Sequence, residues 1–119
     1  MQYQLMIVGW NAVQAKLKMY IVLRPELSVA AAVVAAAHAS LGTYLQFETD
    51  PLMQEWRHTS FVKIILKAIN LHQFQACRNF GAHRVFTEST LENLEVSVGF
   101  NIVVSPHPHF KDIPKWTEG

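Results

Sequence analysis

The sequence predicts an α/β domain, in which a four-stranded, mostly parallel mixed sheet is packed by helices. Three observations support this fold class. The continuous apolar run Leu17–Leu23 has the length and composition of a buried strand. The alanine-rich segment that follows Ser28 is typical of a helix. Segments of strand length and of helix length then alternate along the chain, in the order β-α-β-α-β-β.

The first strand is followed by a helix of small side chains. Arg24-Pro25-Glu26 ends the extended run, and Ser28 is the predicted N-cap, because a serine hydroxyl accepts a hydrogen bond from the first helical turn. The helix SVAAAVVAAAHASLG continues into the amphipathic segment Tyr44–Phe47. Since alanine and valine are small on every face, such a helix can lie very close to a sheet.

Five further elements follow from proline positions, side-chain type and spacing. A proline suits a first helical position, which predicts a helical turn at Pro51–Trp56. β-Branched residues predict a strand at Ser60–Ala68, and apolar residues at helical spacing predict a helix at Leu71–Phe80. Two more strands, His83–Thr87 and Val96–Val104, complete the predicted sheet.

The chain is long enough for one domain with its own apolar core. We expect this domain at residues 16–106, after an N-terminal extension, residues 1–15, that lacks the basic segment and cleavage site of a targeting signal. Residues 107–119 carry little secondary-structure signal and are expected to form a C-terminal tail. Half of the residues are apolar and only 16% are charged, which indicates a surface partly covered by a partner or a second copy. We therefore expect a homodimer.

Several classes of site are excluded by composition. The single cysteine, Cys77, rules out an intrachain disulfide and a cysteine-based zinc site, and it is compatible with a cytoplasmic location. His107-Pro108-His109 offers two imidazoles, which are too few for a metal site, and is interpreted as part of an exposed tail. There is no glycine-rich phosphate loop, nucleophile elbow or dinucleotide fingerprint. We expect neither a metal nor a cofactor.

Charge and hydropathy limit the partners. The net charge of +1 does not indicate an extended nucleic-acid surface, although a local basic patch is compatible with it. Lys63 and Lys67 share one face of the predicted strand; with Arg57 and Arg84 they form either a basic strip for phosphate or one solvated face. The alanine-rich run is interrupted by His38 and followed by polar residues, so we expect no membrane span.

His38 is the candidate residue that the pattern singles out. It lies between Ala37 and Ala39, on a helix that is otherwise nearly all apolar. One interpretation is a hydrogen-bonded histidine in the core or at its rim. The other is a site residue near the strand ends.

Two local motifs and the order of the elements resemble the type of peptidyl-tRNA hydrolase found in archaea and eukaryotes. Val22–Leu27 (VLRPEL) is similar to the family's strand exit, which has an Arg-x-Asp-Leu-like element. Ala37–Ser40 (AHAS) is similar to the histidine end of the family's first helix, and Glu88 falls on a family aspartate when the alignment is counted back from Pro106. The resemblance covers roughly residues 18–106 and implies the family's α/β fold.

The chain differs from the family pattern at several charged positions. The two lysines at the start of the family's helix fall on Val29 and Ala31, and the family's glutamine falls on Ala35. Its Arg-Thr pair falls on Leu91 and Glu92. A cation at the helix start would bind a phosphate or stabilise an oxyanion, which valine and alanine cannot do. The resemblance is therefore to a divergent member that lacks the helix lysines.

The resemblance also implies a site at the strand ends. It gives His38, Glu88 and Thr90 as catalytic residues and Ser40, Thr87 and Ser89 as residues that bind the substrate. A carboxylate raises the basicity of a neighbouring imidazole, and the pair would then activate water against an ester. The alternative for residues 87–90 is a polar turn with helix-cap chemistry.

Two classes of function stay open. The first is a hydrolase that acts on an aminoacyl or peptidyl ester, with tRNA or a small ester as its substrate. The second is a non-catalytic binding or scaffolding domain that kept the fold. The histidine and the acidic residue favour the first class, and the missing helix cations favour the second.

Overall fold

The computed structural model describes residues 16–117, and in this part of the chain five strands form one mixed sheet. The strands are β1 (Leu17–Leu23), β2 (Val62–Lys67), β3 (His83–Glu88), β4 (Leu94–Phe100) and β5 (Val103–Val104). Neighbouring strands follow the order β2-β1-β4-β3, and β5 pairs with the beginning of β1. The expected N-terminal extension, residues 1–15, lies outside the described residues.

The predicted mixed sheet is confirmed, but its pairing is less parallel than expected. Only β1 and β2 pair in parallel, whereas β1–β4, β1–β5 and β3–β4 are antiparallel. The cause is β4, which runs between β1 and β3 in the direction opposite to both. The connection from Glu88 to Leu94 is too short for the crossover that a parallel neighbour needs, so β4 must return beside β3.

The last predicted strand, Val96–Val104, is divided into β4 and β5 in the structure. Asn101 interrupts it: its side-chain oxygen accepts a hydrogen bond from the N–H of Ile102 (2.8 Å), and its amide donates to Asp50 (3.0 Å). Both pieces pair with β1. β4 pairs with the last residues of β1, and β5 pairs with the first residues of β1. The described sheet therefore has five strands instead of the expected four.

Each α-helix begins at a polar side chain that satisfies N–H groups of the first turn. Ser28 caps α2 (Val29–Gln46) through the N–H of Ala31, as predicted, and Asp50 caps α3 (Pro51–His58). Asn70 caps α4 (Leu71–Ala76), which continues as a 3₁₀ turn over Cys77–Phe80. The predicted helix Leu71–Phe80 is thus an α-helix with a tighter last turn.

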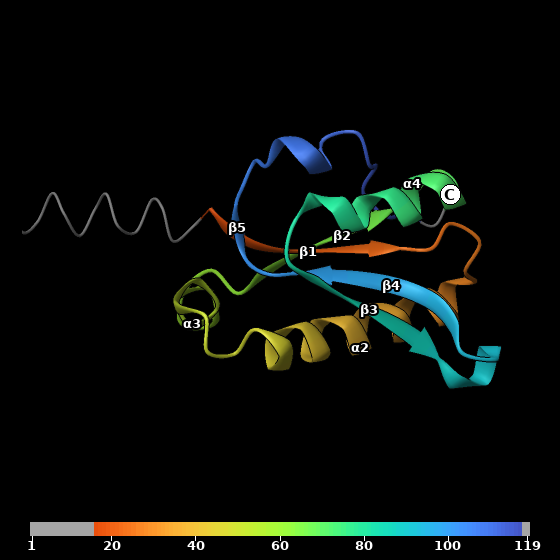
Figure 1. The fold of residues 1–119 in the computed structure, drawn as a ribbon, viewed down its shortest axis with the longest axis horizontal. Helices are drawn as coiled ribbons and strands as arrows, with labels where there is room; N and C mark the ends of the chain where they lie inside the picture. Colours follow the sequence, from red (N-terminus) through yellow and green to blue (C-terminus); the bar gives the residue numbers. More distant parts are fainter. Residues whose placement is uncertain (1–15, 118–119) are drawn as a thin grey trace, which may run out of the picture.

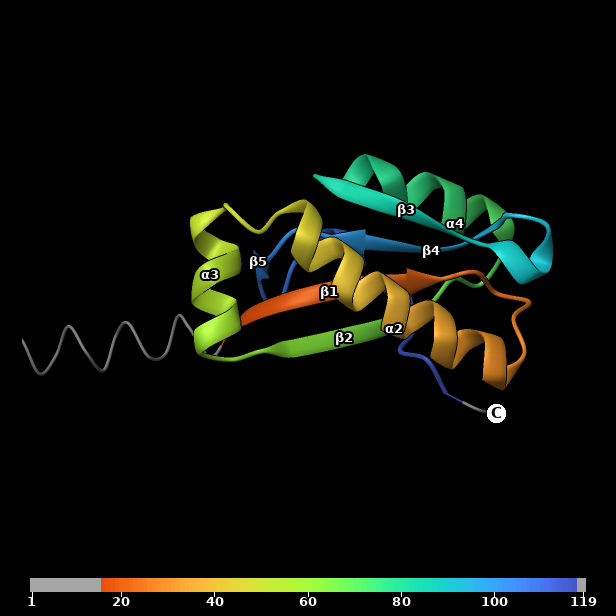
Figure 2. The ribbon, with the colours of Figure 1, turned by 90° about the horizontal axis from the view of Figure 1, so that it is seen from below.

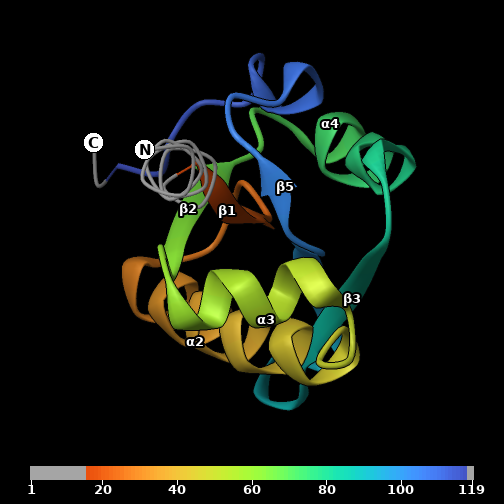
Figure 3. The ribbon, with the colours of Figure 1, turned by 90° about the vertical axis from the view of Figure 1, so that its left-hand side faces the viewer.

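Helices cover both faces of the sheet (Figures 1 and 3). The long α2 crosses one face beneath β1 and β4, and α3 packs on the same side at the end where β1 begins (Figure 2). On the opposite face lie α4 and the segment that follows β5. The 3₁₀ turn Pro108–Phe110 belongs to this segment.

The alternation of side chains along β1 divides the apolar core into two clusters. Met19, Ile21 and Leu23 point toward α2 and α3, where they meet Trp56. The intervening residues, Tyr20 and Val22, pack on the opposite face against α4 and the C-terminal segment. All seven residues of β1 except Lys18 are buried, which explains why this strand is so apolar in sequence.

The small side chains of α2 allow the close packing that the sequence predicts. Ala32, Ala35 and Ala39 are buried against the sheet, whereas Val33 and Leu41 on the outer surface are each 62% exposed. By length and composition alone α2 would be able to cross a membrane. One such helix is weak evidence for a membrane span, because the core helix of a water-soluble domain meets the same criterion.

Residues 107–117, the described part of the expected tail, pack against the domain. Phe110 and Ile113 are buried in the second core cluster. The backbone of this segment also covers part of the outer edge of β2, because Lys67 N–H donates to Pro114 and Trp116 N–H donates to Ile65 (2.9 Å each). Buried aromatic and aliphatic side chains, which the sequence pattern did not reveal here, hold it in place.

A candidate active-site groove between α2 and β3

A groove of about 660 Å³ lies between α2 and β3 and contains several of the predicted site residues. The lining residues from α2 are Ala37, His38, Leu41, Gly42 and Leu45. Those from β3 and the connection that follows it are Arg84, Phe86, Thr87, Glu88, Ser89 and Asn93. The groove is therefore apolar along the helix and polar along the strand, with one imidazole, one carboxylate and one guanidinium.

His38 reaches the groove because of its position on α2. It is on the same helical face as Leu41, Gly42 and Leu45, which follow it by three, four and seven residues. The side chain is exposed, so the interpretation as a core histidine is wrong. Among the described residues it has no hydrogen-bond partner, which leaves both ring nitrogens accessible to water and to a substrate.

Glu88 ends β3 and faces the same groove. Its Oε1 accepts hydrogen bonds from the Thr90 N–H (3.2 Å) and the Thr90 hydroxyl (3.0 Å), and so caps the 3₁₀ turn Ser89–Leu91. These bonds, and to a lesser extent the positive charge of His38, lower the pKa of Glu88. The carboxylate therefore stays ionised and acts on His38 through space, since no hydrogen bond joins the two side chains in this structure.

The other four predicted residues are divided among three places. Thr87 and Ser89 line the groove with His38 and Glu88. Thr90 is bonded to Glu88 but lies beside a different depression, next to Ala30 and Val34. Ser40 lines a separate groove between α2 and α3, together with Trp56, Arg57 and Phe61. The structure thus brings four of the six together, whereas Thr90 and Ser40 each line a different depression.

Arg84 is the charged residue of this groove that sequence reasoning did not assign to it. Its guanidinium lies over the ring of Phe86, 5.0 Å from the centroid, and the side chain is exposed. Phe86 in turn packs on Gly42, where an added Cβ would be only 2.2 Å from the ring. The alternation of β3 was the available signal, because residues two apart share a face of a strand.

The proposed grouping of Arg84 with Lys63, Lys67 and Arg57 as a basic strip is wrong. Lys63 and Lys67 belong to β2, and Arg84 belongs to β3, and these strands occupy opposite ends of the order β2-β1-β4-β3. Lys63 instead lies over the ring of Phe61, and Arg57 over the ring of Tyr44. Arg84 is therefore the only arginine or lysine among the residues that line the α2–β3 groove.

Comparison with known protein families agrees with this fold. The family described as peptidyl-tRNA hydrolase PTH2 matches residues 17–112, which is most of the chain. The chain belongs to the PTH2 family. A search of curated proteins found no match. Family membership confirms the resemblance seen in the sequence, and the match includes both α2 and β3.

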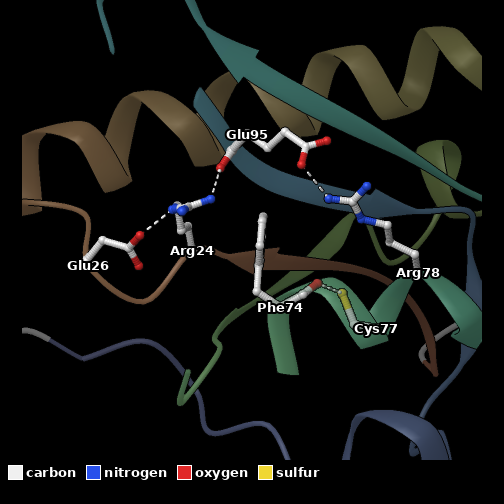
Figure 4. A network of polar contacts seen from close by, with 6 residues as sticks. All are labelled: Arg24, Glu26, Phe74, Cys77, Arg78 and Glu95. Atoms are coloured by element: carbon white, nitrogen blue, oxygen red, sulfur yellow. Dashed lines mark hydrogen bonds and ion pairs between the residues drawn. The ribbon is translucent and has the colours of Figure 1, made fainter. Parts of the chain in front are cut away.

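In this PTH2 domain the arginine of the strand exit has a structural position (Figure 4). Arg24 forms an ion pair with Glu26, donates to the carbonyl of Glu95 (3.2 Å) and lies over the ring of Phe74 (5.9 Å). The side chain of Glu95 then pairs with Arg78 (2.7 Å). Arg24 thereby connects the end of β1 to β4 and α4, and it is not among the residues that line the α2–β3 groove.

Proposed function

We propose that this protein hydrolyses the ester bond that joins a peptide or N-blocked amino acid to tRNA, and that the reaction takes place in the α2–β3 groove. Membership of the PTH2 family supports the reaction class. The observation that carries the proposal is that His38 and Glu88, from distant parts of the sequence, line one groove with a free imidazole and an ionised carboxylate.

The chemistry follows from these groups. His38 accepts a proton from a water molecule as the water oxygen bonds to the ester carbonyl carbon. The resulting tetrahedral species then breaks its bond to the ribose oxygen, and the imidazolium returns the proton to that oxygen. Glu88 favours the imidazolium by its charge. Thr87 and Ser89 add hydroxyls beside the reacting groups.

The direct test is hydrolysis of an N-acetylated aminoacyl-tRNA by the purified chain, with the spontaneous rate in the same buffer as the reference. We expect release of the N-acetyl amino acid well above that rate. A parallel assay with a small N-acetyl amino acid ester tests the alternative substrate from the sequence analysis. If neither ester is cleaved faster than in buffer, the proposed hydrolase function is wrong.

Arg84 is the group in this groove that can bind a phosphate of the tRNA. A guanidinium offers paired donors to phosphate oxygens, and stacking on Phe86 restricts its orientation. We expect Arg84→Gln to raise KM for the tRNA substrate about tenfold, with little change in kcat. Arg57→Gln is the matched control, because Arg57 is also exposed and stacked on an aromatic ring, outside this groove. Equal KM values for the two variants would contradict this role.

A non-catalytic binding domain is the second candidate. It is favoured by the first turn of α2, where Val29 and Ala31 offer no positive charge, and by the bonding of Glu88 to Thr90 instead of His38. Such a protein would bind tRNA, with an affinity that falls as salt is raised, and would leave the ester intact. Binding without cleavage in the assay above would therefore select this candidate.

The homodimer and the cytoplasmic location belong to the same proposal. The outer surface of α2 supports a dimer, because Val33, Val34 and Leu41 are large apolar side chains exposed on one helix. Light scattering on the purified chain measures its mass in solution and tests this point. A mass of one chain at all concentrations would contradict the dimer.

A further inference from the structure

A second polar groove, of about 530 Å³, lies on the face of the sheet opposite α2. It is formed by β1, β2 and the segment that follows β5, which runs along the α4 side of the sheet (Figures 1 and 3). The lining residues are Lys18, Tyr20, Ile64, Leu66, Ser105, Pro106, His107, Phe110, Lys111, Ile113, Pro114 and Lys115. No residue of this groove lines the groove that contains His38.

The charge of this groove is entirely positive. Lys18, Lys111 and Lys115 line it without any aspartate or glutamate; Asp112 is adjacent in sequence but is not a lining residue. None of the three lysines forms an ion pair with any residue in the range 16–117. In a chain with a net charge of only +1, three unpaired ammonium groups around one groove create a local positive potential that attracts anions.

The groove also has a hydroxyl hydrogen available to a ligand. The hydroxyls of Tyr20 and Ser105 are 2.8 Å apart, so one donates to the other and the second keeps its own hydrogen without an acceptor among the described residues. The ring of Tyr20 is stacked on Phe110 with 4.2 Å between centroids, and both residues are buried. This donor is therefore held by a fixed part of the core.

These groups match a phosphate ligand. Lysine ammonium groups and a hydroxyl are donors, and a phosphate offers several negatively charged acceptor oxygens. The other walls are the apolar side chains of Pro106, Ile113 and Pro114, against which a sugar or base can pack. We propose that this groove binds the phosphate of a nucleotide, either free or within an RNA chain. The proposal does not depend on hydrolysis in the other groove.

His107 provides a signal specific to this groove. Burial, and to a lesser extent the charge of His109, lower the pKa of His107, so its imidazole is mainly neutral at pH 7. A phosphate dianion bound beside it favours the protonated ring. Binding should therefore shift the ring-proton resonances of His107, and leave those of His38 and His58, on the α2 and α3 side of the sheet, unchanged.

The test uses the full chain and four probes: uridine 5′-monophosphate, uridine, inorganic phosphate and deacylated tRNA. Titration calorimetry gives affinities, and NMR follows the His107 ring. We expect the monophosphate to bind at least tenfold more tightly than uridine and to shift His107. Lys18→Gln/Lys115→Gln is expected to weaken monophosphate binding at least tenfold. The control Arg57→Gln/Lys63→Gln, which removes the same charge on the α3 side, should leave it unchanged.

Each outcome is decisive. Loss of tRNA affinity in the Lys18/Lys115 variant, relative to its control, identifies RNA as the source of the phosphate. Unchanged tRNA affinity with weakened monophosphate binding identifies a free nucleotide. If the wild-type chain binds none of the phosphate probes, or if the variant binds the monophosphate as tightly as the wild type, the proposal is wrong. Thermal unfolding verifies that the Lys18/Lys115 variant and its Arg57/Lys63 control are folded. The same measurement is made on a third variant, Lys111→Gln.

Discussion

Replacing His38 by alanine is expected to lower kcat for hydrolysis of an N-acetylated aminoacyl-tRNA by about 10²–10⁴-fold, the range that a general base contributes. His38 is the only histidine among the residues that line the α2–β3 groove, so no other imidazole there can accept the proton of the attacking water. The change should have little effect on stability, because the side chain is exposed and alanine is a better helix former than histidine.

Two measurements separate this effect from general damage. His72→Ala removes another exposed histidine, on α4 at the opposite face of the sheet, and should keep the wild-type kcat. The second measurement is the dependence of the hydrolysis rate on pH. The fall in rate at acidic pH that we expect for the wild type should be absent from the residual activity of His38→Ala. Glu88 does not produce that fall, because its lowered pKa keeps it ionised throughout the range in which histidines titrate. Wild-type kcat in His38→Ala would contradict the proposed base.

The local elements of the fold were predictable, because they depend on neighbouring residues. β1 has the bounds predicted from its run of apolar residues, and Ser28 caps α2 as its position indicates. Strand pairing depends on spatial order, which local patterns do not contain. The insertion of β4 between β1 and β3 made two of the four pairings antiparallel, and the pairing of β5 with β1 is the third. The shortness of residues 89–93 was the one local sign of this arrangement.

The candidate site was predictable to a similar extent. The resemblance placed His38 and Glu88 at corresponding family positions, and the structure brings both to one groove. Ser40 follows His38 by two residues on a helix, which turns its side chain about 200° away, so its place in another groove follows from helical periodicity. The hydrogen bonds between Glu88 and Thr90 match the alternative given for residues 87–90, a polar turn with helix-cap chemistry, because Glu88 caps the 3₁₀ turn Ser89–Leu91.

A second large effect is expected at Gly99 of β4. Gly99 pairs with Ile21 and Arg84, and α2 crosses directly over it. A Cβ at this position would lie 1.8 Å from Thr43 Oγ1 and 3.4 Å from the Ala39 carbonyl oxygen, and both of these residues are buried. Gly99→Ala should therefore lower the free energy of unfolding by about 1–3 kcal/mol, the usual cost of overpacking a close-packed core. Chemical denaturation of the purified variant measures this change.

The clash itself can be tested by a double-mutant cycle with Thr43→Ala. This substitution removes the atom nearest to the added Cβ, and Thr43 Oγ1 has no hydrogen-bond partner among the described residues to lose. Gly99→Ala should then cost less in the Thr43→Ala background than in the wild type. Equal costs in both backgrounds would show that the contact with Thr43 is not the cause. Because α2 also carries His38, a helix pushed away from β4 in Gly99→Ala would widen the α2–β3 groove and lower hydrolytic activity. Adding Thr43→Ala should then restore activity together with stability.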